Sequence, residues 1–103
     1  MDETQRRYIA KLKTAEPFLG LRVQVNEAEE YKLQILGRGE MAFYQQNDRA
    51  LLFELSAGAG VILRKSIRRW DDGSKVTDAE RDVIVERVSS YLRSKGAPSI
   101  TVK

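Results

Sequence analysis

The sequence predicts an α+β fold, an antiparallel β-meander of about five strands between an N-terminal helix and a C-terminal amphipathic helix, followed by a short terminal strand. Two observations predict the sheet: apolar and polar residues alternate in short runs, and turn residues separate these runs about every ten positions. The third observation is that apolar residues take helical spacing near the two ends of the chain. We therefore expect an antiparallel sheet whose helices cover one face.

The first element is a helix expected over residues 4–14, with Tyr8, Ile9 and Leu12 on one side. Its end is predicted by Glu16-Pro17, because the residue before a proline is disfavoured in helical dihedrals. The basic residues of this segment lie outside the apolar side, which is typical of a solvated helix face.

Alternating runs after this helix predict the successive strands of the meander. Their apolar members are Leu21, Val23 and Val25, then Tyr31, Leu33 and Ile35, then Met41 and Phe43, then Leu51, Phe53 and Leu55. Polar or glycine-containing turns separate them. A fifth strand is expected over residues 61–69, and it would place Arg64, Arg68 and Trp70 on one face.

The last helix has the clearest start signal in the chain. Thr77 and Glu80 fit a capping box, in which each side chain accepts a hydrogen bond from the backbone of the other residue. Gly96 and Pro98 end the helix, and residues 99–102 are expected to add the short terminal strand. The apolar stripe of this last helix consists of Ile84, Val88, Tyr91 and Leu92.

Length and composition fit a single domain over residues 1–103. The chain is 42% hydrophobic and 32% charged, with a net charge of +3, which is typical of a globular protein with a mild preference for acidic partners. It has no cysteine, no apolar signal-peptide segment and no apolar stretch near the ~18 residues of a membrane span. We expect a cytoplasmic protein without membrane contact.

The absence of both histidine and cysteine excludes a Ser-His-Asp triad, a Cys-His pair and the usual zinc sites. Asp71 and Asp72 could hold magnesium in principle, but Asp-Asp-Gly after a strand is usually a turn. We therefore predict no catalytic residue, metal site or cofactor. The expected function is binding, not catalysis.

The candidate binding residues are Arg64, Lys65, Arg68, Arg69 and Trp70. On a strand, at about 3.3 Å per residue, Arg64 and Arg68 would lie ~13 Å apart and could contact separate phosphates. A basic sheet face with an aromatic residue is a platform for single-stranded nucleic acid. The alternative is a solvated face that protects an edge strand, with the tryptophan packed under the following loop.

The segment Ser66-Ile67-Arg68-Arg69-Trp70-Asp71, followed by Thr77-Asp78-Ala79-Glu80-Arg81 and a helix ending at Gly96, resembles the bacterial immunity protein 74 family of polymorphic toxin systems. The likeness covers about residues 31–102. It differs at Asp72-Gly73, where the family often has a proline. The resemblance implies a protein that neutralises a cognate toxin by direct binding and has no catalytic residues of its own.

The order of elements also resembles single-strand nucleic-acid binders of the PC4 and Whirly type, which dimerise through helices and bind on the sheet. Two hypotheses follow. The first is a protein-binding module of the immunity type, anchored by Arg68, Arg69 and Trp70. The second is a nucleic-acid-binding module in which the basic residues contact phosphates and Trp70 stacks on bases. A homodimer is compatible with both, since residues 99–102 can pair between two chains or within one.

Overall fold

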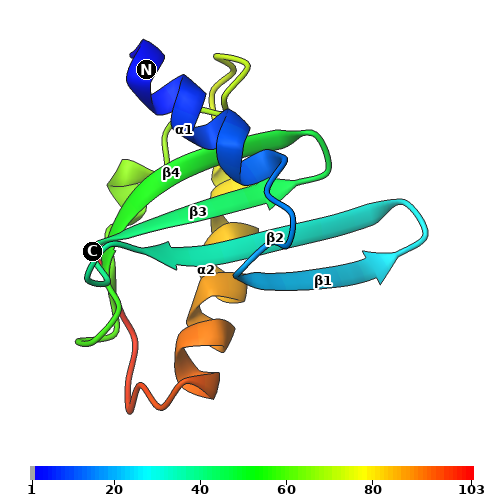
Figure 1. Cartoon of the computed structure of the whole chain (residues 1–103). Coiled ribbons are helices and arrows are strands. Elements are labelled where there is room, and N and C mark those ends of the chain that lie inside the picture. The colour runs from blue at the N-terminus through cyan, green and yellow to red at the C-terminus, as the bar shows by residue number, and fades with distance from the viewer. Residues whose placement is uncertain (1) are drawn as a thin grey trace.

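The computed structural model describes residues 2–103 and has a helix at each end of a strand meander (Figure 1). Its elements are α1 (Glu3–Lys13), β1 (Leu21–Asn26), β2 (Glu29–Leu36), β3 (Met41–Gln46), β4 (Arg49–Ser56), β5 (Val61–Ile62), the 3-10 helix η1 (Arg64–Ser66), α2 (Asp78–Ser94) and β6 (Thr101–Val102). The predicted α+β class and order of elements are confirmed.

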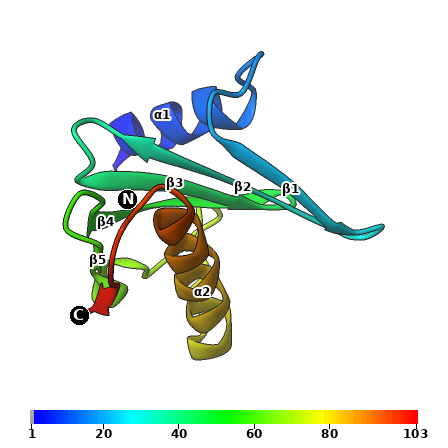
Figure 2. The same cartoon turned by 90° about the horizontal axis from the view of Figure 1, so that it is seen from below.

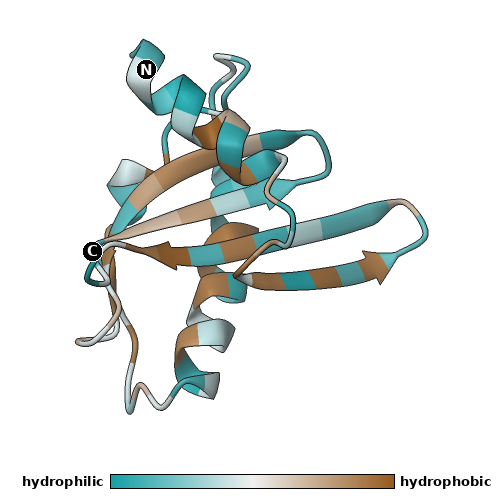
Figure 3. Ribbon diagram, viewed as in Figure 1, coloured by the Kyte–Doolittle hydropathy of each residue, from teal (hydrophilic) through white to brown (hydrophobic). Residues whose placement is uncertain are grey.

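The strands form one sheet in the order β1-β2-β3-β4-β5-β6 across the described chain. Each neighbouring pair from β1 to β5 is antiparallel, and β6 runs parallel to β5 with Thr101 opposite Val61. The alternation that predicted the strands is visible along β1 (Figure 3). The terminal strand therefore pairs with β5 of the same chain and forms one edge of the sheet.

The two helices lie on opposite faces of the sheet (Figure 2), so the expectation that both cover one face is wrong. The reason is that the central strand β3 is apolar on both sides. Phe43 packs with Ile9 and Leu12 of α1, whereas Tyr44, the next residue, packs in the cluster that contains Val88 of α2. A sheet with two apolar faces needs a cover on each.

Both helices begin with side-chain caps. Asp2 accepts a hydrogen bond from the Gln5 N–H at 2.8 Å, and the predicted capping box of Thr77 and Glu80 is confirmed in both directions. Gly96, at φ +100, takes the left-handed conformation that follows the end of α2. Over residues 2–103, no helix is both long and apolar enough to cross a membrane.

The predicted fifth strand is much shorter than residues 61–69, because β5 ends at Ile62 and η1 follows. The chain then returns beside β4 without forming a regular ladder. Ser66 Oγ accepts a hydrogen bond from the Glu54 N–H at 2.8 Å, and the Asp71 N–H donates to the Ala50 carbonyl at 2.8 Å. Between these contacts the returning segment advances five residues and β4 advances four, so the segment bulges.

Replacing Ile9 with alanine should lower the free energy of unfolding by about 3 kcal/mol, because Ile9 is 1% exposed and links α1 to the sheet. Urea denaturation followed by circular dichroism measures the change. The control is Lys11→Ala on the exposed side of the same helix. Equal stability of the two variants would contradict the packing of α1 on this face.

Candidate functional site

All five predicted binding residues lie on a hairpin-like segment, residues 64–76, that we call the basic loop. Its two arms meet where Arg69 pairs with Lys75, and the Val76 N–H donates to the Arg68 carbonyl at 2.9 Å. At the tip, Asp72 accepts a hydrogen bond from the Ser74 N–H at 2.8 Å, and Gly73 has φ +89. A positive φ of this size favours glycine, so the Asp-Asp-Gly sequence forms the predicted turn.

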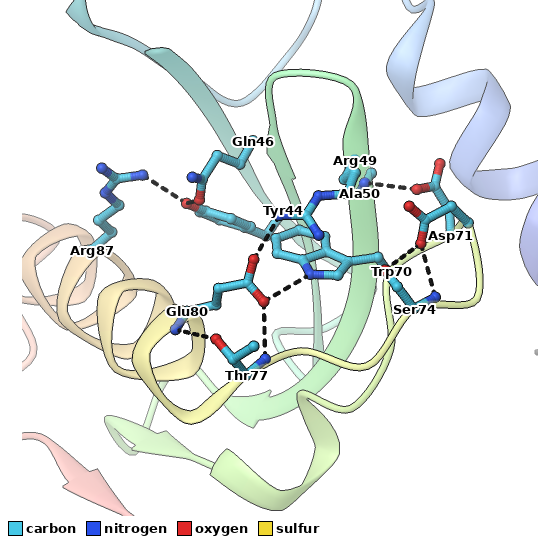
Figure 4. A network of polar contacts seen from close by, with 11 residues as sticks. Tyr44, Gln46, Arg49, Ala50, Trp70, Asp71, Ser74, Thr77, Glu80 and Arg87 are labelled. Carbon is cyan, nitrogen blue, oxygen red and sulfur yellow. Dashed lines mark hydrogen bonds and ion pairs between the residues drawn. The ribbon is translucent and has the colours of Figure 1, made fainter.

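Trp70 holds the basic loop to the rest of the protein (Figure 4). Its side chain is 1% exposed, with its ring 6.3 Å from the Tyr44 ring and the Arg49 guanidinium 4.4 Å from its centroid. Its indole N–H donates to Glu80 at 3.3 Å. The expectation that Trp70 shares an exposed face with arginines is therefore wrong, because the bulge turns the indole into the core.

Glu80 joins the loop to the start of α2. One carboxylate oxygen accepts from the Thr77 N–H at 2.9 Å and from Trp70, and the other accepts from Arg49 at 2.6 Å. Burial alone would raise the pKa of Glu80, but the hydrogen bonds from Thr77, Arg49 and Trp70 outweigh it and lower the pKa below its ordinary value. Glu80 is thus held ionised as part of the scaffold.

A second cluster of polar side chains lies farther along α2 (Figure 4). Arg87 donates to Glu29 at 2.6 Å and to the Tyr44 hydroxyl at 2.8 Å, and that hydroxyl donates to Gln46 at 3.0 Å. Burial raises the pKa of Tyr44 to about 12, although the hydrogen bond from Arg87 opposes the shift. Tyr44 therefore remains protonated and has a structural role.

The two aspartates of the turn make contacts inside the protein. Asp71 accepts from the Ala50 N–H at 3.0 Å and from Lys13 at 2.9 Å, which ties the loop to β4 and α1. Asp72 bonds to Ser74, whose side-chain and backbone hydrogen bonds lower the pKa of Asp72. In the part of the chain that is described, no group of three or more acidic, histidine or cysteine residues could hold a metal ion.

The basic residues differ in their partners. Arg64 faces α2 and forms an ion pair with Asp82 at 2.9 Å. Arg69 donates to the Gly73 carbonyl at 3.0 Å, while the exposed Lys65 and Arg68 form no ion pair within residues 2–103. The structure thus separates Arg64 from the others and places two cations, Arg69 and Lys75, directly opposite each other.

Lys75 was missed by sequence reasoning. The signal was present, because a hairpin turn at Asp72-Gly73 brings the residues on either side of it together. Like charges directly opposite each other on paired strands repel, so an anion beside this pair would stabilise the loop.

An open pocket of about 400 Å³ lies beside the basic loop, between α1 and β4. Arg68 and Arg69 line one side, and Gln5 of α1 is a further lining residue. Met41 and Leu52 form an apolar part of the pocket wall. The arrangement fits a ligand group with negative charge attached to an apolar portion, because guanidinium groups form strong charge-assisted hydrogen bonds with anions.

No family model, curated protein or solved structure matches this chain. The resemblance to the immunity protein 74 family therefore stays a prediction, as does the binding role of the basic residues.

Replacing Glu80 with glutamine should lower the free energy of unfolding by about 1–2 kcal/mol at neutral pH, since it removes charge-assisted hydrogen bonds at the helix cap. The folded-state pKa of Glu80 is lowered, so its stabilisation is present above the ordinary value of 4.5 and is lost as pH falls through the lowered pKa. The difference in free energy of unfolding between wild type and Glu80→Gln should therefore shrink as pH falls through that lowered pKa. Urea denaturation between neutral and acidic pH measures it.

The matched control is Glu86→Gln, on the exposed part of the same helix. A constant difference between wild type and Glu80→Gln across the whole pH range would show that the carboxylate charge is not what holds the cap.

Proposed function

We propose that this chain is a non-catalytic protein-binding module of the immunity-protein type, which neutralises a toxin by direct contact at the basic loop and its neighbouring pocket. The observation that carries the proposal is the position of Arg68 and Arg69, two exposed guanidinium groups on a pocket whose wall includes Met41 and Leu52. Exposed arginine beside apolar side chains is typical of the residues that dominate protein interfaces.

The rigidity of the basic loop supports a binding role. Trp70 is buried in the core and Asp71 bonds to Ala50 of β4, so the arm of the loop that carries the neighbouring arginines is positioned before a partner arrives. A loop that is already ordered loses less conformational entropy on binding. Among the described residues, the ion pairs that support the fold use other charged groups. Lys65 and Arg68 are therefore available to a binding partner.

Single-stranded nucleic acid is the second candidate, and the concentration of positive charge favours it. Lys65, Arg68, Arg69 and Lys75 are all exposed on one loop. However, the Trp70 ring is buried, and helices pack on both faces of the sheet. The stacking surface expected for that hypothesis is therefore covered, which ranks it below a protein partner.

The variant Arg68→Glu/Arg69→Glu should bind its toxin roughly tenfold to a hundredfold more weakly, because it replaces the pocket's positive charge with negative charge. Cells that express the toxin encoded beside this chain's gene should be rescued by wild type and poorly by the variant. Calorimetry with the purified toxin domain gives the affinity. The control Lys11→Glu/Lys103→Glu changes the net charge equally at exposed positions outside the pocket.

A parallel titration with labelled oligothymidine, over a range of salt concentrations, separates the two candidates. A protein partner predicts weak binding of the oligonucleotide. Tight, strongly salt-dependent binding that is lost in the same variant, together with no neutralisation of the toxin, would replace the first candidate with the second.

A further inference from the structure

The edge of β4 that faces the basic loop has a gap in its hydrogen bonding. At Ala50, the N–H donates to Asp71 Oδ1 at 3.0 Å and the carbonyl accepts from the Asp71 N–H. At Glu54, the N–H donates to Ser66 Oγ and the carbonyl accepts from the Leu63 N–H at 3.1 Å. Both residues thus direct their main-chain groups toward the returning segment.

Leu52 lies midway between these two residues. Because strand geometry repeats every two residues, its N–H and carbonyl point toward the same edge. The alternate residues of β4 direct their main-chain groups toward β3 instead. The Leu55 N–H, for example, donates to the Glu40 carbonyl. Among residues 2–103, no hydrogen-bond partner occurs for the Leu52 main chain on the loop side.

The bulge in the basic loop accounts for this gap. The extra residue between Ser66 and Asp71 carries Arg68 and Arg69 away from β4 at the level of Leu52. The same bulge leaves the pocket that Leu52, Arg68 and Arg69 line together. One irregularity therefore brings Leu52, with its free main-chain N–H, and two arginines to one open space.

The donors around this space match a carboxylate. Leu52 offers its N–H, the two arginines offer guanidinium N–H groups, and Gln5 offers its side-chain amide. Glu54 also lines the pocket, but it forms no ion pair with the arginines in the described residues. Its carboxylate can accept from a peptide N–H of the same ligand.

We propose that this pocket binds the side-chain carboxylate of an Asp or Glu in an extended segment of the partner protein, with the Leu52 N–H as one donor and Arg68 and Arg69 as the others. The proposal rests on the proposed function and specifies the partner's chemistry. The Leu52 carbonyl accepts a main-chain N–H of the bound segment, and an apolar neighbour of the acidic residue packs on Met41.

The first test is a titration of the ¹⁵N-labelled full chain with a blocked peptide of alternating Glu and Leu, and with the matched Gln and Leu peptide. The Glu peptide should shift the Leu52 amide signal and the Arg68 and Arg69 Nε–H signals. The Gln peptide should leave them in place at equal concentration. Binding of the Glu peptide with no shift at Leu52 would overturn the subsite while leaving the proposed function intact.

A charge series at Gln5 tests the position of the site without changing the loop. Gln5→Glu should weaken binding of the Glu peptide roughly threefold to tenfold by repulsion, and Gln5→Lys should strengthen it. The matched control is Thr4→Glu, which adds the same charge at an exposed neighbour outside the pocket lining. Equal effects of Gln5→Glu and Thr4→Glu would overturn the placement.

Two further probes identify the source of the anion. Succinate at the peptide's concentration should shift Leu52 weakly, and equal affinity for succinate would overturn a protein segment as the ligand. Oligothymidine should not shift Leu52, and a shift with oligothymidine alone would overturn the carboxylate. No binding of the Glu peptide would overturn the subsite, whereas toxin neutralisation would still decide the proposed function separately.

Discussion

The indole of Trp70 packs against the Tyr44 ring and the Arg49 guanidinium, and its N–H donates to Glu80. This contact joins three parts of the protein that are distant in sequence: the sheet, the basic loop and the first turn of α2. Arg69, the neighbour of Trp70, is exposed on the pocket's rim as a result of the same bend. The buried aromatic ring and the exposed cations therefore belong to one arrangement, in which the core determines what the surface presents.

The charged residues fall into two groups with different roles, those that support the fold and those that are free to contact a partner. Arg49 and Arg87 lie over the aromatic rings of Trp70 and Tyr31 at 4.4 Å and pair with carboxylates, so they connect α2 to the sheet. Removing one partner of such a partly buried pair is costly, because the other charge then loses its partner. Arg68, in contrast, has no ion pair within the described residues. A partner can engage it without breaking any contact that supports the fold.

Local signals in the sequence were sufficient for α1, the first four strands and α2, because alternation and capping are properties of neighbouring residues. The face that each helix covers was not predictable in the same way, since Phe43 and Tyr44 are both large and apolar and either can point toward a helix. The burial of Trp70 involves Arg49 and Glu80, which are distant in sequence and meet the ring only in the folded chain. Lys65 falls at an apolar position of the expected strand, which suggested a bulge or an edge position, but the sequence did not show how the bulge between Ser66 and Asp71 arranges Arg68 and Arg69, and Lys75 was missed.

The bulge also bears on how a partner would be recognised. A carboxylate held by a main-chain N–H and two guanidinium groups makes directional contacts at one fixed place, and few counterions are released when it binds. A polyanion crossing the basic loop would instead release condensed counterions at every phosphate it meets, so its affinity would fall steeply with salt. The same residues, Arg68 and Arg69, serve both modes, but only the first uses the Leu52 N–H. The free main-chain N–H at Leu52 is therefore the feature that distinguishes a carboxylate-binding site of defined geometry from a merely positive surface.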